Sequence, residues 1–433
     1  MSDDPRSTRL TGPVERQRAI YMGGLAGRRP TVPVGMADLE AAAARCMSAE
    51  GYAYIAGGAG REDTMARNLS AFGHWQIKPR MLFDVAEQDT SVELFGRRLP
   101  TPFLLCPIGV LEMAHPDADV AVARAAADTG MPYIFSSQAS RTMEDCAAAM
   151  GDAPRWFQLY WNKSDEMVES FVSRAEACGC EAIVVTLDTT LLGWRTRDLE
   201  LAHLPFLHGK GIAQYTSDPV FRRQLADPLP GPDAKQPLNR HTLRVLMQVL
   251  RKWPDGMLDG LRSGQALAAV RRFIATYSRP TLTWDDLAFL RERTRLPILL
   301  KGILDPEDAR KSLDYGVDGL LVSNHGGRQV DGSVATIEQL PGIVAAVDGC
   351  IPVIMDSGIR GGADAFKALA LGATAVGIGR PYCYGLALAG EAGVREVLTN
   401  FHADFQLTMA LAGCRSVAEI DRRRIAGPDT GDA

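Results

Sequence analysis

The chain has 433 residues, of which 46% are hydrophobic and 23% are charged. This length allows either one large α/β domain with insertions or two to three smaller domains, each with a sizeable core. The formal net charge of −5 comes without a block of basic residues. The charge pattern argues against nucleic acid or an anionic membrane as a partner and favours small molecules.

The N-terminal part is expected to be an arm followed by a helix and a hairpin. Residues 1–35 are rich in Arg, Pro and Gly and lack an apolar signal segment. No apolar run approaches the roughly 18 residues of a membrane span, so we expect a cytoplasmic protein. From Met36, ADLEAAAARCMSAEGYAYIAGGAG predicts one helix that ends in glycines, and SVELFGRRLPTP predicts a hairpin with its turn at FGRR.

Eight short apolar runs follow, each bounded by turn signals and most followed by a segment of helical spacing. They are FLLCP (103–107), YIFSS (133–137), WFQLY (156–160), AIVVTLD (182–188), PILLKG (297–302), GLLVSN (319–324), PVIMDSG (352–358) and AVGIGR (375–380). Continuous apolar runs indicate strands buried on both faces, hence a parallel sheet. Eight βα units predict an α/β fold, a closed (β/α)₈ TIM barrel, as one domain over residues 36–433.

One interval breaks this rhythm, because about 110 residues separate the fourth run from the fifth. It contains the loop-like DPLPGPDAKQP and one or two helices, in RHTLRVLMQVL and SGQALAAVRRFI. An insertion after a barrel strand lies at the catalytic mouth. We therefore expect residues 200–280 to form an active-site lid, the alternative being an oligomer contact.

The eight cysteines are scattered through apolar patterns, without a CxxC pair or a Cys/His ligand spacing. We interpret them as reduced core thiols and predict no metal site.

Polar residues or glycines follow each of the eight runs, where a barrel would gather them at one mouth. They are Gly109, Ser136, Gln158, Tyr160, Thr186, Asp188, Lys301, Ser323, His325, Arg328, Asp356, Arg360, Gly379 and Arg380. Individually they have ordinary explanations: Ser136 and Thr186 as helix caps, Tyr160 as a half-buried aromatic. Lys301 has one too, as an ion-pair partner. Their presence at all eight strand ends predicts a shared binding site.

The last two units place glycine and arginine just before a predicted helix, in DSGIRGGAD and GIGRP. Backbone N–H groups and a helix N-terminus at the seventh and eighth strands of a barrel can hold a phosphate dianion. Ordinary glycine turns are the alternative. A phosphate at this place belongs to a cofactor or to a phosphorylated substrate.

A second group, His325, Arg328, Asp188, Tyr160 and Arg195, is expected beside the phosphate. Two guanidinium groups suit a carboxylate because each offers a planar fork of donors. A histidine within reach of an aspartate is a general base with a fixed tautomer. We expect the two glycines after His325 to let a substrate approach closely, so that His325 removes its proton.

These motifs together resemble a known family. FQLY, TLDT, LLKG, SNHGGRQ, DSGIRGGAD and GIGRP, in this order, resemble the FMN-dependent α-hydroxy acid oxidising enzymes, among them glycolate oxidase, lactate oxidase and mandelate dehydrogenase. The likeness runs from about residue 37 to 425. GYAYIAGGAG, TLDTTLLGWRTRDL and the long insertion are most similar to lactate 2-monooxygenase. The resemblance implies FMN, a homotetramer or homo-octamer, and oxidation of an L-2-hydroxy acid to the 2-oxo acid with O₂ as acceptor.

The resemblance also implies residue roles. His325 is the implied base, supported by Asp188, while Arg195 and Arg328 bind the substrate carboxylate. Two tyrosines are implied to bond the substrate's carboxylate and hydroxyl, Tyr54 and Tyr160. Implied FMN contacts, from the flavin to the phosphate, are Pro107, Ile108, Gly109, Ser136, Gln158, Thr186, Lys301, Ser323, Asp356, Gly358, Arg360, Gly379 and Arg380.

Two segments depart from the family pattern. Gln138, in FSSQAS, stands where glycolate oxidase has a tryptophan, and residues 190–192 read TLL without that enzyme's Pro-Arg. A polar amide at the substrate wall predicts a 2-hydroxy acid with a polar or larger side chain. In the alternative, Gln138 turns aside and the pocket accepts lactate.

Three further questions stay open at this point. Electrons leave the substrate as a hydride or through a carbanion, with the same role for His325. Peroxide either decarboxylates a product that is still caged, or leaves together with the 2-oxo acid, depending on how long the lid retains the product. The competing functions are a Schiff-base aldolase that uses Lys301 on a phosphorylated substrate and a non-catalytic sensor of a phosphate ligand.

Overall fold

The structure is a computed structural model that describes residues 10–228 and 239–428. Its centre is a closed parallel barrel whose strands are hydrogen-bonded in the order β10-β11-β4-β5-β6-β7-β8-β9. These strands are β4 (Phe103–Leu105), β5 (Tyr133–Ser136), β6 (Arg155–Leu159), β7 (Ile183–Thr186), β8 (Ile298–Ile303), β9 (Gly319–Val322), β10 (Val353–Met355) and β11 (Ala375–Ile378). All eight predicted strands and the (β/α)₈ barrel are confirmed.

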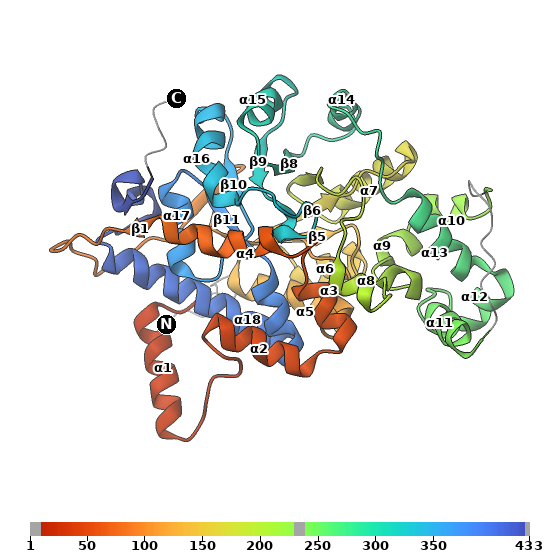
Figure 1. Ribbon diagram of the computed structural model, residues 1–433, viewed down its shortest axis with the longest axis horizontal. Coiled ribbons are helices and arrows are strands. Elements are labelled where there is room, and N and C mark those ends of the chain that lie inside the picture. Colours follow the sequence, from red (N-terminus) through yellow and green to blue (C-terminus); the bar gives the residue numbers. More distant parts are fainter. Residues whose placement is uncertain (1–9, 229–238, 429–433) are drawn as a thin grey trace.

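Helices surround the barrel and cover the outer faces of its strands (Figure 1). They are α5 (Ala118–Thr129), α6 (Met143–Met150), α7 (Asp165–Ala177), α14 (Asp286–Arg291), α15 (Pro306–Asp314), α16 (Thr336–Val347), α17 (Gly362–Ala370) and α18 (Arg380–Leu411). Several begin at a side-chain cap: Thr142 Oγ1 accepts from the Asp145 N–H at 3.1 Å. Each such cap satisfies a helix N–H that has no partner within the helix.

The predicted hairpin forms β2 (Val92–Leu94) and β3 (Arg97–Leu99), paired antiparallel. Phe95 and Gly96 both take positive φ, at 50° and 76°, as a two-residue hairpin turn requires. Leu94 and Leu99 join the apolar cluster inside the barrel. The hairpin therefore packs on the barrel's interior core. The carboxyl ends of the barrel strands remain open for a binding site.

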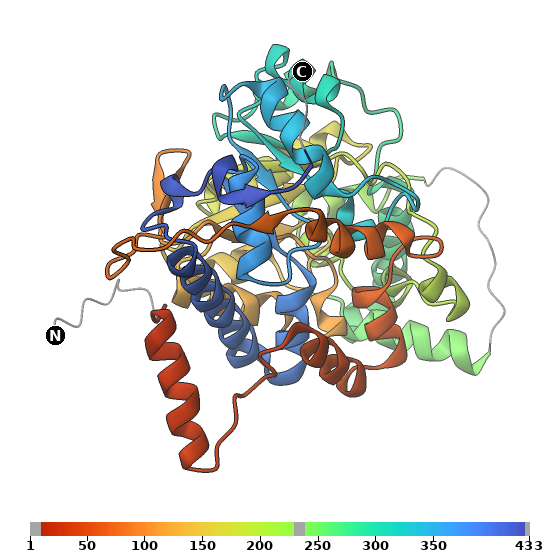
Figure 2. The same ribbon diagram turned by 60° about the vertical axis from the view of Figure 1, so that its left-hand side comes forward.

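The N-terminal part contains α1 (Pro13–Leu25), α2 (Met36–Cys46), α3 (Ala49–Ala56), α4 (Asp63–Ser70) and η1 (Ala71–His74). The helical pattern predicted from Met36 forms two helices rather than one continuous helix. Ser48 is extended and its hydroxyl accepts from the Gly51 N–H, so a new helix starts there. Within the expected arm, α1 lies beside α18 (Figure 2), where Arg16 donates to Asn400 and pairs with Glu396.

The insertion contains more helices than the one or two expected. They are α8 (Thr196–Glu200), η3 (Pro205–His208), α9 (Ala213–Thr216), α10 (Pro219–Gln224), α11 (Arg240–Arg251), α12 (Met257–Ser263) and α13 (Gln265–Thr276). Most of DPLPGPDAKQP lies outside the described residues. Helices α9 to α13 form a lobe at one flank of the barrel (Figure 1), built on a cluster of aromatic rings that includes Phe206, Tyr215 and Phe273.

The remaining elements are short. They are β1 (Gln76–Ile77), η2 (Leu111–Met113), η4 (His325–Gly327), η5 (Val417–Glu419), η6 (Arg422–Arg424) and β12 (Ile425–Ala426). Strands β1 and β12 pair antiparallel. All eight cysteines are free thiols, but Cys46 and Cys350 are exposed rather than in the core. Within the described ranges, no helix combines the length and the apolar character needed to cross a membrane.

Candidate active site

One cavity opens where the barrel strands end, and most of the predicted site residues line it. These are Tyr54, Pro107, Ile108, Gly109, Gln138, Tyr160, Thr186, Arg195, Lys301, His325, Arg328, Asp356, Gly358, Arg360, Gly379 and Arg380. The other four predicted residues, Ser136, Gln158, Asp188 and Ser323, do not line it but bond to side chains or backbone around it.

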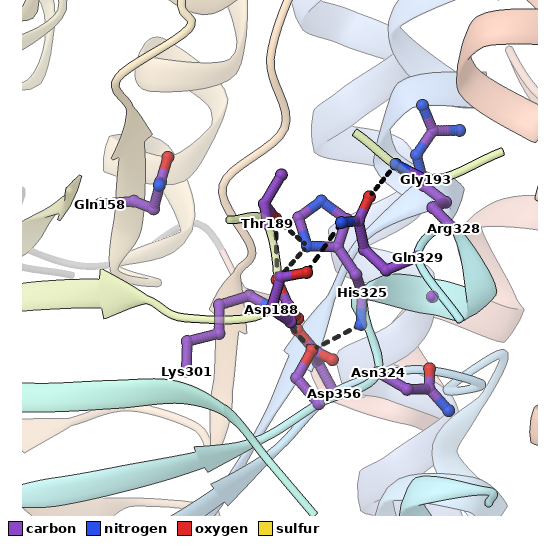
Figure 3. Close-up of polar contacts among 12 residues, drawn as sticks. Gln158, Asp188, Thr189, Gly193, Lys301, Asn324, His325, Arg328, Gln329 and Asp356 are labelled. Carbon is purple, nitrogen blue, oxygen red and sulfur yellow. Dashed lines mark hydrogen bonds and ion pairs between the residues drawn. The ribbon is translucent and has the colours of Figure 1, made fainter. Parts of the chain in front are cut away.

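His325 and Asp188 form a half-buried pair beside this cavity (Figure 3). His325 Nδ1 lies 2.8 Å from Asp188 Oδ1, which leaves Nε2 as the free ring nitrogen. Burial lowers the pKa of His325, and the Asp188 carboxylate opposes this shift. Desolvation by itself would raise the pKa of Asp188, but the charge and hydrogen bond of His325, the charge of Lys301 and the Thr189 hydroxyl together lower it. The pair therefore holds a neutral imidazole ready to accept a proton and a carboxylate ready to stabilise the imidazolium.

Arg195 and Arg328 bring two guanidinium groups to the same cavity. Arg328 Nη1 donates to the Gly57 carbonyl at 2.8 Å, and its guanidinium carbon lies 5.1 Å from the centre of the Tyr54 ring. Burial and the neighbouring Arg195 lower the pKa of Arg328 to about 9. Within the described residues neither arginine has a carboxylate partner within 4.0 Å. Two unneutralised guanidinium groups in a buried cavity predict an anionic ligand.

Tyr54 and Tyr160 stay protonated in this surrounding. Burial raises the pKa of both hydroxyls, and the Asp188 charge raises the pKa of Tyr160 further. Both side chains line the cavity. Each therefore offers a neutral O–H donor to a ligand.

Lys301 is buried and paired. Its Nζ lies 2.8 Å from Asp356 Oδ2 and 2.5 Å from Ser323 Oγ. Burial would lower the pKa of Lys301, but the charges of Asp356 and Asp188 raise it above its ordinary value. The amine therefore stays a cation. A Schiff-base lysine must lose its proton to attack a carbonyl, so this geometry disfavours the aldolase alternative.

The glycine and arginine residues of the last two units line the cavity where α17 and α18 begin. Arg360 and Arg380 have no carboxylate within 4.0 Å among the described residues. Arg380 donates to the carbonyls of Ile55, Gly57 and Gly326. A doubly charged phosphate would complete this positive end of the cavity.

The middle of the cavity fits a flat ring with heteroatoms at its edges. Thr186 Oγ1 and Gln158 Nε2 are buried and have no hydrogen-bond partner in the described structure. Both stand at the ends of neighbouring strands, β7 and β6, and Lys301 holds its charge beside them. An FMN isoalloxazine ring would supply partners for such orphaned groups. The donor set and the positive end therefore fit FMN.

Gln138 occupies one wall of the cavity and is only 6% exposed. Its backbone N–H donates to Ser136 Oγ, while no described residue bonds to its side-chain amide. Gly109 and Gly211 pack against it, and a Cβ at either would come within about 3 Å of Gln138 atoms. These contacts hold the Cβ and backbone of Gln138 at the wall, and its side-chain amide has no hydrogen-bond partner among the described residues.

The two glycines after His325 serve the fold more directly than substrate access. Gly326 and Gly327 take φ of 65° and 75°, and His325 itself takes 57°. A Cβ on Gly326 would lie 2.7 Å from Arg380 Nη1, and one on Gly327 would lie 2.7 Å from the Met65 backbone nitrogen. The segment needs glycine because a guanidinium and a helix lie directly against it.

Several cavity residues were not predicted from the sequence, among them Thr189 and Tyr277. Thr189 donates to Asp188 Oδ1 at 2.9 Å and lies 3.4 Å from His325 Nδ1, and its place next to Asp188 in TLDT was a usable signal. Tyr277 comes from the end of the insertion and stacks on Phe273 at 5.1 Å between ring centres. No sequence pattern marked Tyr277 as a cavity residue.

Comparisons with known proteins agree with this site. The profile described as FMN-dependent dehydrogenase matches residues 43–427. An L-lactate oxidase of Lysinibacillus sphaericus is 43% identical over 89% of this chain and 90% of its own length. A 4-hydroxymandelate oxidase of Amycolatopsis orientalis is 39% identical over 90% of this chain and 97% of its own length.

Solved structures give the same result for the fold. The crystal structure of mandelate oxidase with benzoyl-formic acid aligns with a TM-score of 0.72 at 35% identity. The alignment covers 91% of this chain and 98% of the other. By the matching profile, the extent of these relatives and the geometry of the cavity, the chain belongs to the FMN-dependent dehydrogenase family.

Proposed function

We propose that this protein is an FMN-dependent enzyme that oxidises a 2-hydroxy acid to the 2-oxo acid with O₂ as acceptor. The observation that carries the proposal is one cavity that holds the His325–Asp188 pair and two guanidinium groups without carboxylate partners. The two guanidinium groups can bind the substrate carboxylate, and the imidazole can accept the proton of the neighbouring hydroxyl. Homologues named as oxidases of lactate, 4-hydroxymandelate and other 2-hydroxy acids support this reading.

Each residue has a role that follows from its position in or beside the cavity. Arg195 and Arg328 hold the carboxylate, which orients the hydroxyl-bearing carbon, and His325 Nε2 removes the hydroxyl proton. Asp188 stabilises the imidazolium that results. The hydroxyls of Tyr160 and Tyr54 donate to the substrate's hydroxyl and carboxylate oxygens.

Thirteen residues are proposed to hold FMN. When bound, FMN supplies a two-electron acceptor for the substrate's α-carbon. The backbone of residues 107–109 would hold the flavin edge, and Ser136, Gln158 and Thr186 would hold the ring. Lys301 places a cation at the pyrimidine end. The ribityl chain and the phosphate would be bound by Ser323, Asp356, Gly358, Arg360, Gly379 and Arg380.

The insertion is proposed to decide the final products. Tyr277, at its end, lines the cavity beside Arg195. If the 2-oxo acid is retained while hydrogen peroxide forms, the two react to give CO₂, water and an acid one carbon shorter. If it leaves first, the 2-oxo acid and peroxide are released. We also propose a cytoplasmic homotetramer or homo-octamer.

A second part of the proposal concerns the substrate. Gln138 presents an amide without a protein partner, and burying an unpaired amide costs about 1–3 kcal/mol. A substrate whose side chain carries a polar group supplies that partner, whereas the methyl group of lactate does not.

Anaerobic mixing of the FMN-loaded protein with a panel of 2-hydroxy acids tests the function, followed by product analysis under air. We expect flavin bleaching by at least one acid of the L series. A colourless protein that takes up no FMN on reconstitution, or FMN-loaded protein that no 2-hydroxy acid bleaches, would overturn the proposal.

A further inference from the structure

Gln329 connects two parts of the site that are far apart in the sequence. It follows Arg328 directly and reaches the loop of residues 188–195 (Figure 3). Its Nε2 donates to the Asp188 carbonyl at 2.7 Å and to the Leu191 carbonyl at 2.9 Å. Both N–H groups of the amide therefore donate to the loop that begins at Asp188, the partner of His325.

The other half of the same amide holds the far end of the loop. Gln329 Oε1 accepts from the Gly193 N–H at 3.3 Å and from Arg195 Nη2 at 3.2 Å. The contact is close, because a Cβ on Gly193 would lie 2.4 Å from the Arg328 carbonyl oxygen. All four hydrogen-bonding positions of one side chain thus lie on this loop.

Packing contributes little to the position of this loop. Leu191 and Trp194 are 70% and 72% exposed. Ser278 Oγ donates to the carbonyls of Thr189 and Thr190, which fixes only the first half. Among the described side chains, that of Gln329 is the one that contacts both the Asp188 end and the Arg195 end. The Arg195 end has separate support, since the Trp194 carbonyl accepts from the Gly60 N–H at 2.8 Å and Arg195 Nε donates to the Arg328 carbonyl at 3.5 Å. The Gln329 amide is what joins this end to the Asp188 end.

We propose that Gln329 is a positioning residue that couples Arg195 to the Asp188–His325 pair. It sets the carboxylate-binding guanidinium at a fixed distance from the base, so that a carboxylate held by Arg195 and Arg328 has its neighbouring hydroxyl at His325. This inference rests on the proposed function. It assigns to a residue without direct substrate contact part of the alignment on which proton removal depends.

The first test is Gln329→Leu in the FMN-loaded protein, with oxalate as the probe because it has two carboxylates and no hydrogen to remove. Loss of an amide that orients a charged group should weaken oxalate binding by about 10-fold or more, measured by calorimetry. The loss of kcat/KM should be larger, since the base is displaced as well. The acid limb of the pH profile of kcat/KM should move to lower pH, because a displaced Asp188 raises the pKa of His325 less.

Gln214→Leu is the matched control. The Gln214 amide is also buried, accepts from the Met143 N–H and donates to the carbonyls of Ser136 and Arg141, but it does not touch the 188–195 loop. We expect this variant to lose thermal stability and to keep the oxalate affinity and the pH profile. Gln329→Glu, which keeps the two acceptor contacts, serves if Gln329→Leu does not fold, and should also bind oxalate more weakly.

A double-mutant cycle with Arg195→Ala decides whether Gln329 acts through that arginine. Oxalate binding should be non-additive, so that Gln329→Leu changes little once Arg195 is removed. Unchanged oxalate affinity in Gln329→Leu and Gln329→Glu, or equal losses in both backgrounds, would refute the coupling. Either result leaves the proposed function intact, provided that the unsubstituted protein is bleached by a 2-hydroxy acid.

Discussion

Arg328 combines burial, a lowered pKa and the absence of a described carboxylate partner, so its charge has to be met by a ligand. Its guanidinium lies over Tyr54 and is anchored through Nη1 to the Gly57 carbonyl. A lysine amine is a point charge of different reach and cannot reproduce this planar arrangement.

Arg328→Lys is therefore expected to lower both substrate affinity and kcat, with kcat/KM down by about 10-fold or more. Steady-state kinetics with the best acid of the panel measures the effect, with FMN content as the control for cofactor binding. An unchanged kcat/KM would mean that the substrate carboxylate binds elsewhere.

Gln138 gives a prediction about selectivity. Because its amide has no hydrogen-bond partner among the described residues, the ratio of kcat/KM for a 2-hydroxy acid with a polar side chain over L-lactate should exceed one. Gln138→Leu should lower that ratio by about 5-fold to 150-fold, which corresponds to an unpaired amide of about 1–3 kcal/mol. If the unsubstituted protein prefers lactate and the variant leaves the ratio unchanged, Gln138 has no part in selection.

At the scale of the element, the proposed role of the insertion in deciding the products gives a prediction. Its lobe lies at the flank of the barrel, and Tyr277 brings its end to the cavity. Tyr277→Ala removes this wall and should shorten product residence.

We therefore expect Tyr277→Ala to release more hydrogen peroxide and 2-oxo acid, relative to the acid one carbon shorter, than the unsubstituted protein does. Peroxide assay and product chromatography under air give the ratio. Tyr215→Phe, a buried change in the same aromatic cluster that does not line the cavity, is the control. An equal product ratio in all three proteins would show that the insertion does not govern product release.

The barrel was predictable because each buried parallel strand is a continuous apolar run with turn residues at both ends. The meeting of Asp188 with His325 followed from the same rule, since both stand at the carboxyl ends of strands. The break between α2 and α3 was not predicted, because the apolar pattern continues through Ser48. Tyr277 was missed because its position depends on how the insertion folds back, which local periodicity does not record.

At the scale of the whole molecule, His402 in α18 links stability to pH. It is 5% exposed, its Nδ1 has no partner among the described residues, and burial lowers its pKa to about 4. An unfolded histidine has a pKa near 6.5, so between these values the unfolded chain binds more protons. The contribution of neutral His402 to the free energy of unfolding is therefore complete above pH 6.5 and is lost as the pH falls towards 4.

For His402 alone this linkage amounts to about 2 kcal/mol between pH 7.5 and pH 5. His402→Leu should reduce the difference in unfolding free energy between these two pH values by about that amount. Urea unfolding at both pH values measures it, with His241→Leu at an exposed position of α11 as the control. A variant with the same pH difference as the unsubstituted protein would show that His402 does not cause the loss.

The central claim is that His325 removes the substrate's proton in an FMN-loaded barrel, and anaerobic flavin reduction by His325→Ala tests it most directly. The variant should bind FMN with unchanged stoichiometry, because the side chain is the base and not a proposed cofactor contact. The rate of bleaching by the best 2-hydroxy acid should fall by about 10²–10⁴ or more. Bleaching at a near-normal rate, with FMN fully bound, would contradict the account and assign proton removal to another residue.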